Sequence, residues 1–308
     1  MYWIKKLPTL GAQRFVSYEN IVITDRNPID VAVDTVKDIA KRYPAPYTVF
    51  ASGGVDSQAC IYSWLQSGVD FEVVFVNYEN NFNTHDFVEL ELMQQKYGFK
   101  LKSLEFNVID FLTTRLKDYA MKYKTISPMI CTHFAISEMI NEGTVIFSGN
   151  YSPPCPKYLD YPTESWMSYL EVTKRNIVPC FFLEDPELAT AFYKIHDIEY
   201  SDIEERYPDT TKDVNGKYER EYKVKCAVYT NAGFPIIPQP YKATGFEKIK
   251  DYCDIHFKAT LHERLKYSDM PSKRSFEIKF RYPLMQLIPE SLHHVKVVNY
   301  TKTLTLTK

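Results

Sequence analysis

The sequence contains no run of about 18 consecutive apolar residues, the length that a helix needs to cross a bilayer. Its first residues also lack the apolar core and the small-residue cleavage site of a signal peptide. No two of its six cysteines form a C-x-x-C pair, which disfavours zinc ribbons, iron–sulfur sites and dithiol redox motifs. These absences predict a cytoplasmic protein with reduced thiols and no membrane partner.

Two common nucleotide-binding signatures are missing as well. The chain has 10 glycines in 308 residues, and none of them falls in a G-x-G-x-x-G or a G-K-[ST] string. The first absence excludes the dinucleotide fingerprint. The second excludes the Walker A loop together with its phosphate-binding lysine. A phosphate site in this chain therefore requires a loop of another kind.

The composition is that of a globular protein, with 45% hydrophobic and 25% charged residues. The formal net charge of −2 carries no strong polyanion signal, but the charge is unevenly spread. Residues 1–200 contain 18 Lys and Arg against 25 Asp and Glu, whereas residues 201–308 contain 19 against 14. Two interpretations of the basic C-terminal part stay open: a surface that faces a nucleic acid or nucleotide, or an ordinary solvated surface.

Apolar strand-like segments alternate with helical ones over most of the chain. The patterns predict strands at 47–51, 71–77, 101–106 and 144–147, and helices at 28–43, 57–67, 84–97, 107–123, 130–141 and 187–196. Such alternation indicates βαβ units and therefore a doubly wound α/β fold with a mostly parallel sheet. These sheets bind ligands beyond the carboxyl ends of their strands, where the strand order reverses. We expect the loops after 47–51 and 144–147 to lie there.

One short segment has the composition of a phosphate site. Ser52-Gly53-Gly54-Val55-Asp56-Ser57 follows the first of these strands and opens a helix. The two glycines let the backbone approach an anion closely, and the free N–H groups at the positive helix end bind phosphate. Ser52 and Ser57 add hydroxyl donors. Asp56 would repel a bare phosphate, so it suits a magnesium ligand or an orienting group.

This string resembles the PP-loop of the N-type ATP pyrophosphatases, the adenine nucleotide α-hydrolase-like superfamily. GMP, asparagine and NAD synthetases, cyano-deazaguanine synthases and several tRNA thiolation enzymes share that loop. The matching positions are Ser52, Gly53, Gly54, Asp56 and Ser57. The resemblance implies a PP-loop ATP pyrophosphatase domain over roughly residues 45–200. In these families a substrate oxygen attacks the α-phosphate of ATP, pyrophosphate leaves, and a nucleophile later displaces AMP.

The resemblance also implies roles for individual residues. It makes Asp56 and Ser57 catalytic, makes Asp56 the metal ligand, and makes Ser148-Gly149-Asn150 the second nucleotide-site segment. By the same resemblance the backbone near Val76 and Asn77 would contact adenine. The implied cofactors are ATP and Mg²⁺. The acceptor would be a small molecule or a nucleobase that becomes an amide, a nitrile or a thio compound, with ammonia or sulfur from a separate donor.

Departures from the known members leave the reaction open. Met1-Tyr2 offers no N-terminal cysteine nucleophile and no Cys-His-Glu glutaminase is evident, so ammonia would come free or from a partner. The missing C-x-x-C disfavours the thiolation enzymes that use paired cysteines, although Cys131 and Cys155 flank the predicted site. One alternative is a phosphoadenosine-phosphosulfate reductase-like enzyme, which residues 131–200 resemble loosely. Another is a non-catalytic nucleotide-binding module.

The alternation stops near residue 200, and the rest predicts an α+β appendage. Its signals are a turn at Asp213-Val214-Asn215-Gly216, a proline-punctuated loop at 234–240, short helices within 245–268, and strands at 276–280 and 295–304. We expect residues 201–308 to wall the cleft and select the acceptor or partner, and residues 1–44 to pack on the core as strands and a helix. The basic residues that could meet an anionic acceptor are Lys223, Lys225, Lys242 and Arg281.

Overall fold

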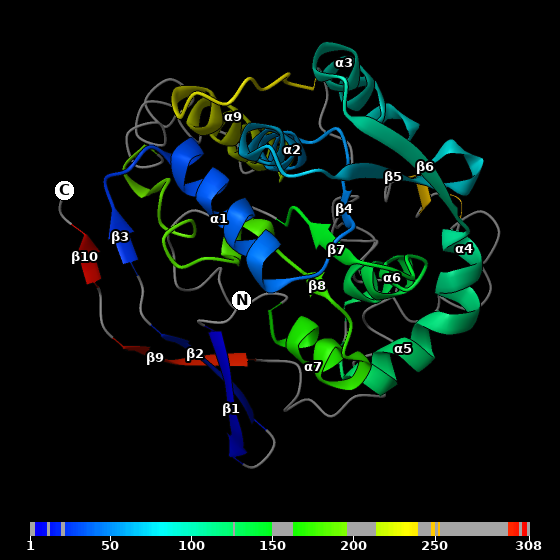
Figure 1. Cartoon of the computed structure of the whole chain (residues 1–308). Coiled ribbons are helices and arrows are strands. Elements are labelled where there is room, and N and C mark those ends of the chain that lie inside the picture. Colours follow the sequence, from blue (N-terminus) through cyan, green and yellow to red (C-terminus); the bar gives the residue numbers. More distant parts are fainter. Residues whose placement is uncertain are drawn as a thin grey trace.

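A central sheet of five parallel strands organises the protein (Figure 1). The computed structural model describes residues 4–10, 13–19, 22–125, 127–149, 163–195, 214–239, 248–249, 252, 295–301 and 304–306. The strand order is β6-β5-β4-β7-β8, and all neighbouring pairs are parallel. The strands are β4 (Tyr47–Phe50), β5 (Glu72–Tyr78), β6 (Lys100–Phe106), β7 (Thr144–Phe147) and β8 (Ile177–Val178).

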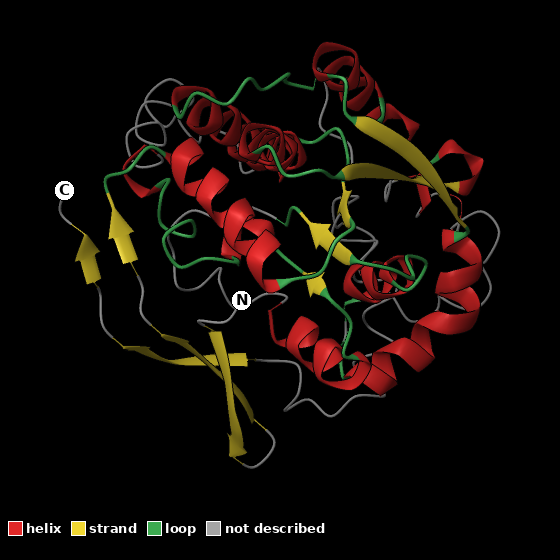
Figure 2. Cartoon of the chain, in the orientation of Figure 1, coloured by secondary structure: helices red, strands yellow, loops and turns green. Residues whose placement is uncertain are grey.

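Helices cover both faces of this sheet (Figure 2). Because side chains alternate along a strand, Val49 packs with the helices of one face and Phe50 with those of the other. The first face carries α1 (Pro28–Arg42), α2 (Val55–Ser67), α3 (Val88–Tyr97) and α9 (Val214–Asn231). The second face carries α4 (Val108–Asp110), α5 (Leu116–Tyr123), α6 (Pro128–Ser137) and α7 (Thr163–Thr173). The chain is therefore a doubly wound α/β fold, as the alternation predicts.

The strand order reverses at β4. From β4 the chain moves outward through β5 to β6, then returns to the other side of β4 to form β7 and β8. Connections that leave β4 and β7 in opposite directions open a crevice beyond the carboxyl ends of these two strands. The loops after Phe50 and Phe147 start at this point.

Several helices differ in detail from their predicted spans. The helix after β4 begins at Val55, so Asp56 and Ser57 lie in its first turn. The segment predicted as a helix over 84–97 contains a 3-10 turn (Thr84–Asp86) before α3. The segment predicted over 107–123 is divided by a π-helical stretch (Phe111–Arg115) between α4 and α5.

Two predictions of local structure are wrong. Val214, Asn215 and Gly216 begin the 18-residue helix α9 instead of forming a turn. Burial of Val224 and Val228 against the sheet-facing helices stabilises this helix and overrides the local Asn-Gly preference.

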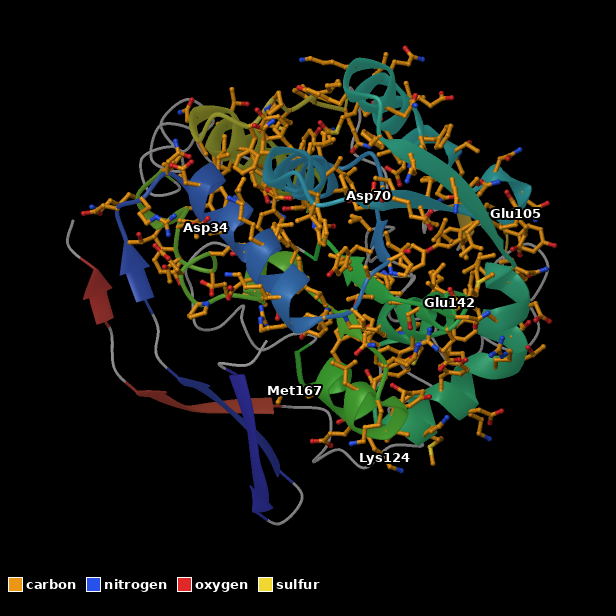
Figure 3. All side chains as sticks on the ribbon, viewed as in Figure 1. Asp34, Asp70, Glu105, Lys124, Glu142 and Met167 are labelled. Atoms are coloured by element: carbon orange, nitrogen blue, oxygen red, sulfur yellow. The ribbon has the colours of Figure 1, made fainter. Side chains whose placement is uncertain are left out.

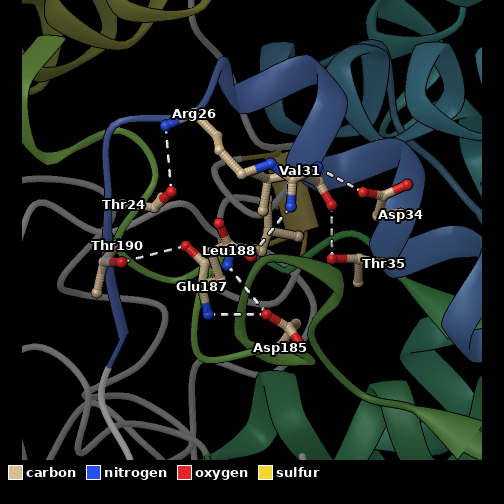
Figure 4. Close-up of polar contacts among 9 residues, drawn as sticks. All are labelled: Thr24, Arg26, Val31, Asp34, Thr35, Asp185, Glu187, Leu188 and Thr190. Atoms are coloured by element: carbon tan, nitrogen blue, oxygen red, sulfur yellow. Dashed lines mark hydrogen bonds and ion pairs between the residues drawn. The ribbon is translucent and has the colours of Figure 1, made fainter. Parts of the chain in front are cut away.

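The predicted helix at 187–196 is a series of turns up to residue 192, and helical conformation is described only at 193–195. Asp185 Oδ1 accepts hydrogen bonds from the backbone N–H groups of Glu187 (2.7 Å) and Leu188 (3.3 Å) (Figure 4). Asp185 thus caps this start, but the backbone bonds that follow, from the N–H of Thr190 to Glu187 (3.2 Å) and of Ala191 to Leu188 (3.3 Å), span three residues and form turns. Arg26 ties the segment to α1, because its guanidinium contacts both Glu187 (3.2 Å) and Asp34 (2.5 Å).

The two ends of the chain meet in small sheets. β1 (Ile4–Leu10) pairs antiparallel with β2 (Gln13–Glu19), and β2 pairs parallel with β9 (Val295–Thr301). β3 (Val22–Thr24) pairs parallel with β10 (Leu304–Leu306). The sequence predicts strands at both ends but not this pairing. The region boundaries near residues 44 and 200 stay predictions, and the predicted strand at 276–280 lies outside the described residues. Within the described part, no helix has the length and apolarity to span a bilayer.

Candidate functional site

The loop after β4 is held by its own hydroxyl groups. The N–H of Ser52 donates to Ser57 Oγ (3.2 Å), and the N–H of Gly54 donates to Ser52 Oγ (3.3 Å). Gly54 is the extended residue that precedes α2. The loop therefore wraps the N-terminus of a 13-residue helix, where the free backbone N–H groups carry partial positive charge.

The loop after β7 lies beside it. Ser148 Oγ is 3.2 Å from Ser57 Oγ, so the two loops meet at the reversal of the strand order. The structure thus brings Ser52, Ser57, Ser148 and the neighbouring Gly149 together. Asn150, the third residue of this predicted segment, lies outside the described residues.

Both of these loops contain a glycine that no other residue replaces easily. A Cβ on Gly53 would lie 2.3 Å from the backbone oxygen of Asp86, so close packing of the loop on the segment after β5 requires glycine. Gly149 has φ +68°, and a Cβ there would lie 2.1 Å from Cys180 Sγ. The conformation and the contact both select glycine at position 149.

Asp56 points to α9. The ammonium of Lys225 is 2.9 Å from Asp56 Oδ2, and the hydroxyl of Tyr229 donates to Asp56 Oδ1 at 2.7 Å. The sequence singles out Lys225 for an anionic acceptor and misses Tyr229. Their spacing of four places them on one helix face, but the turn predicted at 213–216 conceals the helix that carries them.

These contacts bear on the metal role predicted for Asp56. Mg²⁺ takes octahedral oxygen ligands and is usually held by one or two carboxylates together with waters and phosphates, whereas here each oxygen of Asp56 has a donor from α9. Within the described ranges, no group of three His, Cys, Asp or Glu residues could hold a metal ion. These contacts support the other predicted role of Asp56, an orienting group, and its role as a metal ligand stays a prediction. The positive charge beside it is that of Lys225.

The segment after α9 also reaches the loop. Gln58, which is fully buried in the first turns of α2, donates to the carbonyls of Gly53 (2.7 Å) and Ile237 (2.8 Å). Its Oε1 accepts from the N–H of Ile237 at 2.7 Å. Two residues on, Gln239 Nε2 donates to Asp86 Oδ1 at 3.0 Å. The described C-terminal residues thus contact the loop directly, whereas Lys242 and Arg281 lie outside the described residues.

The segment predicted to meet adenine lies where β5 extends beyond the end of β4. There the side chain of Asn83 replaces the missing strand: it donates to the carbonyl of Val76 (2.7 Å) and accepts from the N–H of Tyr78 (2.9 Å). The amide of Asn77 donates to both oxygens of Glu105 (2.9 and 3.0 Å), an exposed residue of the edge strand β6 (Figure 3). Adenine contact at Val76 and Asn77 stays a prediction.

The structure describes one of the two cysteines singled out in the sequence. Cys131 is buried in α6, where burial raises the pKa of its thiol, and Cys155 lies outside the described residues. The sequence gives no signal for Cys180, whose sulfur is 3.9 Å from the carbonyl of Ser148. Cys60 on α2 is fully buried. Burial raises the pKa of its thiol, and the neighbouring Cys180 raises it further.

Comparison with known proteins gives limited information. No family model matches the chain, and no curated protein matches it. Among solved structures, an NMN synthetase from Francisella tularensis is similar over 70% of this chain and 99% of that chain, with 16% identity and a TM-score of 0.32. A similarity of that size carries no functional argument. The fold is defined by the order of the five parallel strands.

Proposed function

We propose that this protein is an ATP-dependent adenylating enzyme, which cleaves ATP to AMP and pyrophosphate and so activates an oxygen of its acceptor. The observation that carries the proposal is the position of the loop Ser52–Ser57. It lies at the reversal of a doubly wound sheet, on the N-terminus of α2, with Ser148 Oγ 3.2 Å from Ser57 Oγ. Loop, helix end and second segment are the parts that a nucleotide phosphate site needs.

Three hydroxyl groups and the helix end would bind the phosphates. The hydroxyls of Ser52, Ser57 and Ser148 can rotate to donate to phosphate oxygens, and the backbone of Gly53 and Gly54 can approach them closely. The partial positive charge at the start of α2 favours the pyrophosphate end of ATP. This arrangement binds phosphate without the lysine of a Walker A loop.

Cleavage requires a positive charge beside the departing pyrophosphate, where negative charge develops. Lys225 supplies it in this proposal, because its ammonium lies 2.9 Å from Asp56 at the start of α2. Asp56 and Tyr229 orient that side chain and keep it beside the phosphates. Asp56 thus acts as the orienting group, and Ser57 contacts the phosphate directly.

The C-terminal region would select the acceptor. Ile237 and Gln239 of this region contact Gln58 and Asp86 beside the loop, which supports a role of residues 201–308 in the wall of the site. The acceptor is proposed to be a small molecule or nucleobase that is amidated, converted to a nitrile or thiolated, with ammonia or sulfur from a separate donor. A nucleic-acid acceptor would instead give binding that weakens steeply with salt.

The test is the pair of products formed from ATP labelled at the α-phosphate. The full chain is incubated with this ATP, with and without a small-molecule extract that supplies the acceptor. The proposal expects AMP and pyrophosphate from the wild type and from Ser67→Ala, a control at the far end of α2, but much less from Ser57→Ala. Formation of ADP and phosphate would refute the proposed function.

A further inference from the structure

A buried cluster of oxygen acceptors lies against the phosphate loop. Asp86 ends the 3-10 turn after β5, Glu89 is in the first turn of α3, and Gln239 comes from the C-terminal segment. Their exposed fractions are 7%, 5% and 5%. Side chains of this kind are rarely buried unless a donor or a cation satisfies them.

The amide of Gln239 is oriented by its neighbour. An ionised carboxylate only accepts hydrogen bonds, so the amide nitrogen of Gln239 must face Asp86, and it does so at 3.0 Å. The amide oxygen of the same side chain, Oε1, takes no part in that bond. It is excluded from solvent, and among the residues that the structure describes it has no hydrogen-bond donor.

Glu89 leaves a second acceptor without a donor. Its Oε2 is excluded from solvent and has no hydrogen-bond partner in the described part of the chain. This oxygen is 3.0 Å, and the backbone oxygen of Asp86 is 2.3 Å, from the point where a Cβ on Gly53 would stand. Tyr222 holds the backbone of Gln239: its hydroxyl accepts from the N–H of Gln239 at 2.5 Å.

We propose that Asp86, Glu89 and Gln239 form a binding site for a divalent cation such as Mg²⁺ or Mn²⁺. Carboxylate and amide oxygens are the ligands that these cations prefer, and a cation held by one or two carboxylates completes its shell with water and phosphate oxygens. The site adjoins Gly53, on the loop expected to hold the phosphates of ATP. Cation binding follows from the two buried oxygens of Glu89 and Gln239 that have no donor among the described residues, whereas a role in ATP cleavage rests on the proposed function.

The direct test is a calorimetric and EPR titration of the nucleotide-free full chain with MnCl₂. It is repeated at two pH values, because the imidazole of His85 lies beside the cluster, with Nε2 3.9 Å from Asp86 Oδ1. We expect one bound Mn²⁺ that MgCl₂ displaces. Glu89→Gln, which keeps the size of the side chain, should weaken binding at least about tenfold. Glu91→Gln, an exposed position on the same helix, should not change it.

Further variants locate the ion. Gln239→Leu should also weaken Mn²⁺ binding, and Asp56→Asn should leave it unchanged. Both results support the proposal even if Glu89→Gln fails to fold, which its thermal unfolding in EDTA reveals. Three results would overturn the proposal. The wild type does not bind Mn²⁺, or Asp56→Asn loses the binding, or NH₄⁺ from NH₄Cl displaces the bound Mn²⁺ and so shows that the site does not select a divalent cation. Since the titration contains no ATP, these failures are separate from a failure to form AMP.

Discussion

The ammonium of Lys225 lies 2.9 Å from Oδ2 of Asp56, although the two residues are 169 positions apart in the chain. The contact joins the middle of α9 to the first turn of the helix that follows the phosphate loop. Both side chains are largely buried, with exposed fractions of 23% for Lys225 and 16% for Asp56. Loss of one partner would leave the other charge with reduced compensation in a poorly solvated place.

Lys225→Met should reduce ATP cleavage by roughly a hundred- to a thousandfold, the usual effect of removing one electrostatic stabiliser of a transition state. The methionine keeps most of the volume of the lysine stem, so the variant should stay folded. The rate of AMP formation at saturating ATP measures the effect. Lys37→Met, at an exposed position of α1, is the matched control and should keep the wild-type rate. Equal rates for both variants would show that Lys225 has no role in ATP cleavage.

Tyr229→Phe removes a hydroxyl and keeps a ring. The ring of Tyr229 packs against Phe182, Phe192 and Phe234 with centroid distances of 5.7, 5.5 and 5.6 Å, contacts that phenylalanine retains. The lost bond is the one that the hydroxyl donates to the Asp56 carboxylate at 2.7 Å. A hydrogen bond to a charged group contributes about 1.5–3 kcal/mol, so the free energy of unfolding in urea should fall by that amount.

The control for Tyr229→Phe is Tyr62→Phe. Tyr62 also packs against Phe234, with a centroid distance of 6.0 Å, and no hydrogen bond of its hydroxyl is found within the described ranges. Its replacement should change the free energy of unfolding by less than about 0.5 kcal/mol. A Tyr229→Phe protein as stable as the control would show that the bond to Asp56 does not hold α9 on the loop.

Gly149→Ala and Gly68→Ala separate backbone strain from steric overlap. The two glycines have similar positive φ angles, +68° and +74°, so alanine meets a similar conformational penalty of about 1–2 kcal/mol at each. At Gly68 a Cβ would meet nothing within 4 Å, but at Gly149 it would lie 2.1 Å from Cys180 Sγ. Gly149→Ala should therefore destabilise the protein clearly more and weaken ATP binding, because it displaces Ser148. Equal melting temperatures in calorimetry would contradict the contact.

The contrast between predicted and observed elements has a physical basis. β4, β5 and β7 are short runs buried on both faces, and that local signal together with the glycines at 53 and 54 predicts the sheet and the loop. The contacts of α9 depend on tertiary packing, which overrides the turn preference of Asn215-Gly216. The pairing of β2 with β9 joins segments almost a whole chain apart, and no local pattern encodes it.

The same reasoning applies within the site. The phosphate loop can be recognised from the sequence, because its five matching residues fall within six consecutive positions: Ser52, Gly53, Gly54, Asp56 and Ser57. The partners of Asp56 and the buried amides of Gln58 and Gln239 cannot be recognised in this way, since a single glutamine or lysine has many possible neighbours. In the folded protein these residues are neighbours, and their hydrogen bonds show which buried oxygens lack a donor among the described residues.

His133 should make the protein less stable in mild acid. Burial lowers the pKa of this histidine, whose ring packs on Phe147 at 5.2 Å, from 6.5 to about 4. In the unfolded chain His133 therefore binds a proton below pH 6.5, whereas in the native protein it binds one only below about pH 4. Stability is complete above pH 6.5 and is lost as the pH falls through this window, by roughly 2 kcal/mol at pH 5. Urea unfolding of the wild type and of His133→Leu at pH 7.5 and pH 5 measures the loss. The leucine variant should show a smaller decrease than the wild type, and identical decreases would mean that His133 is protonated in the native protein.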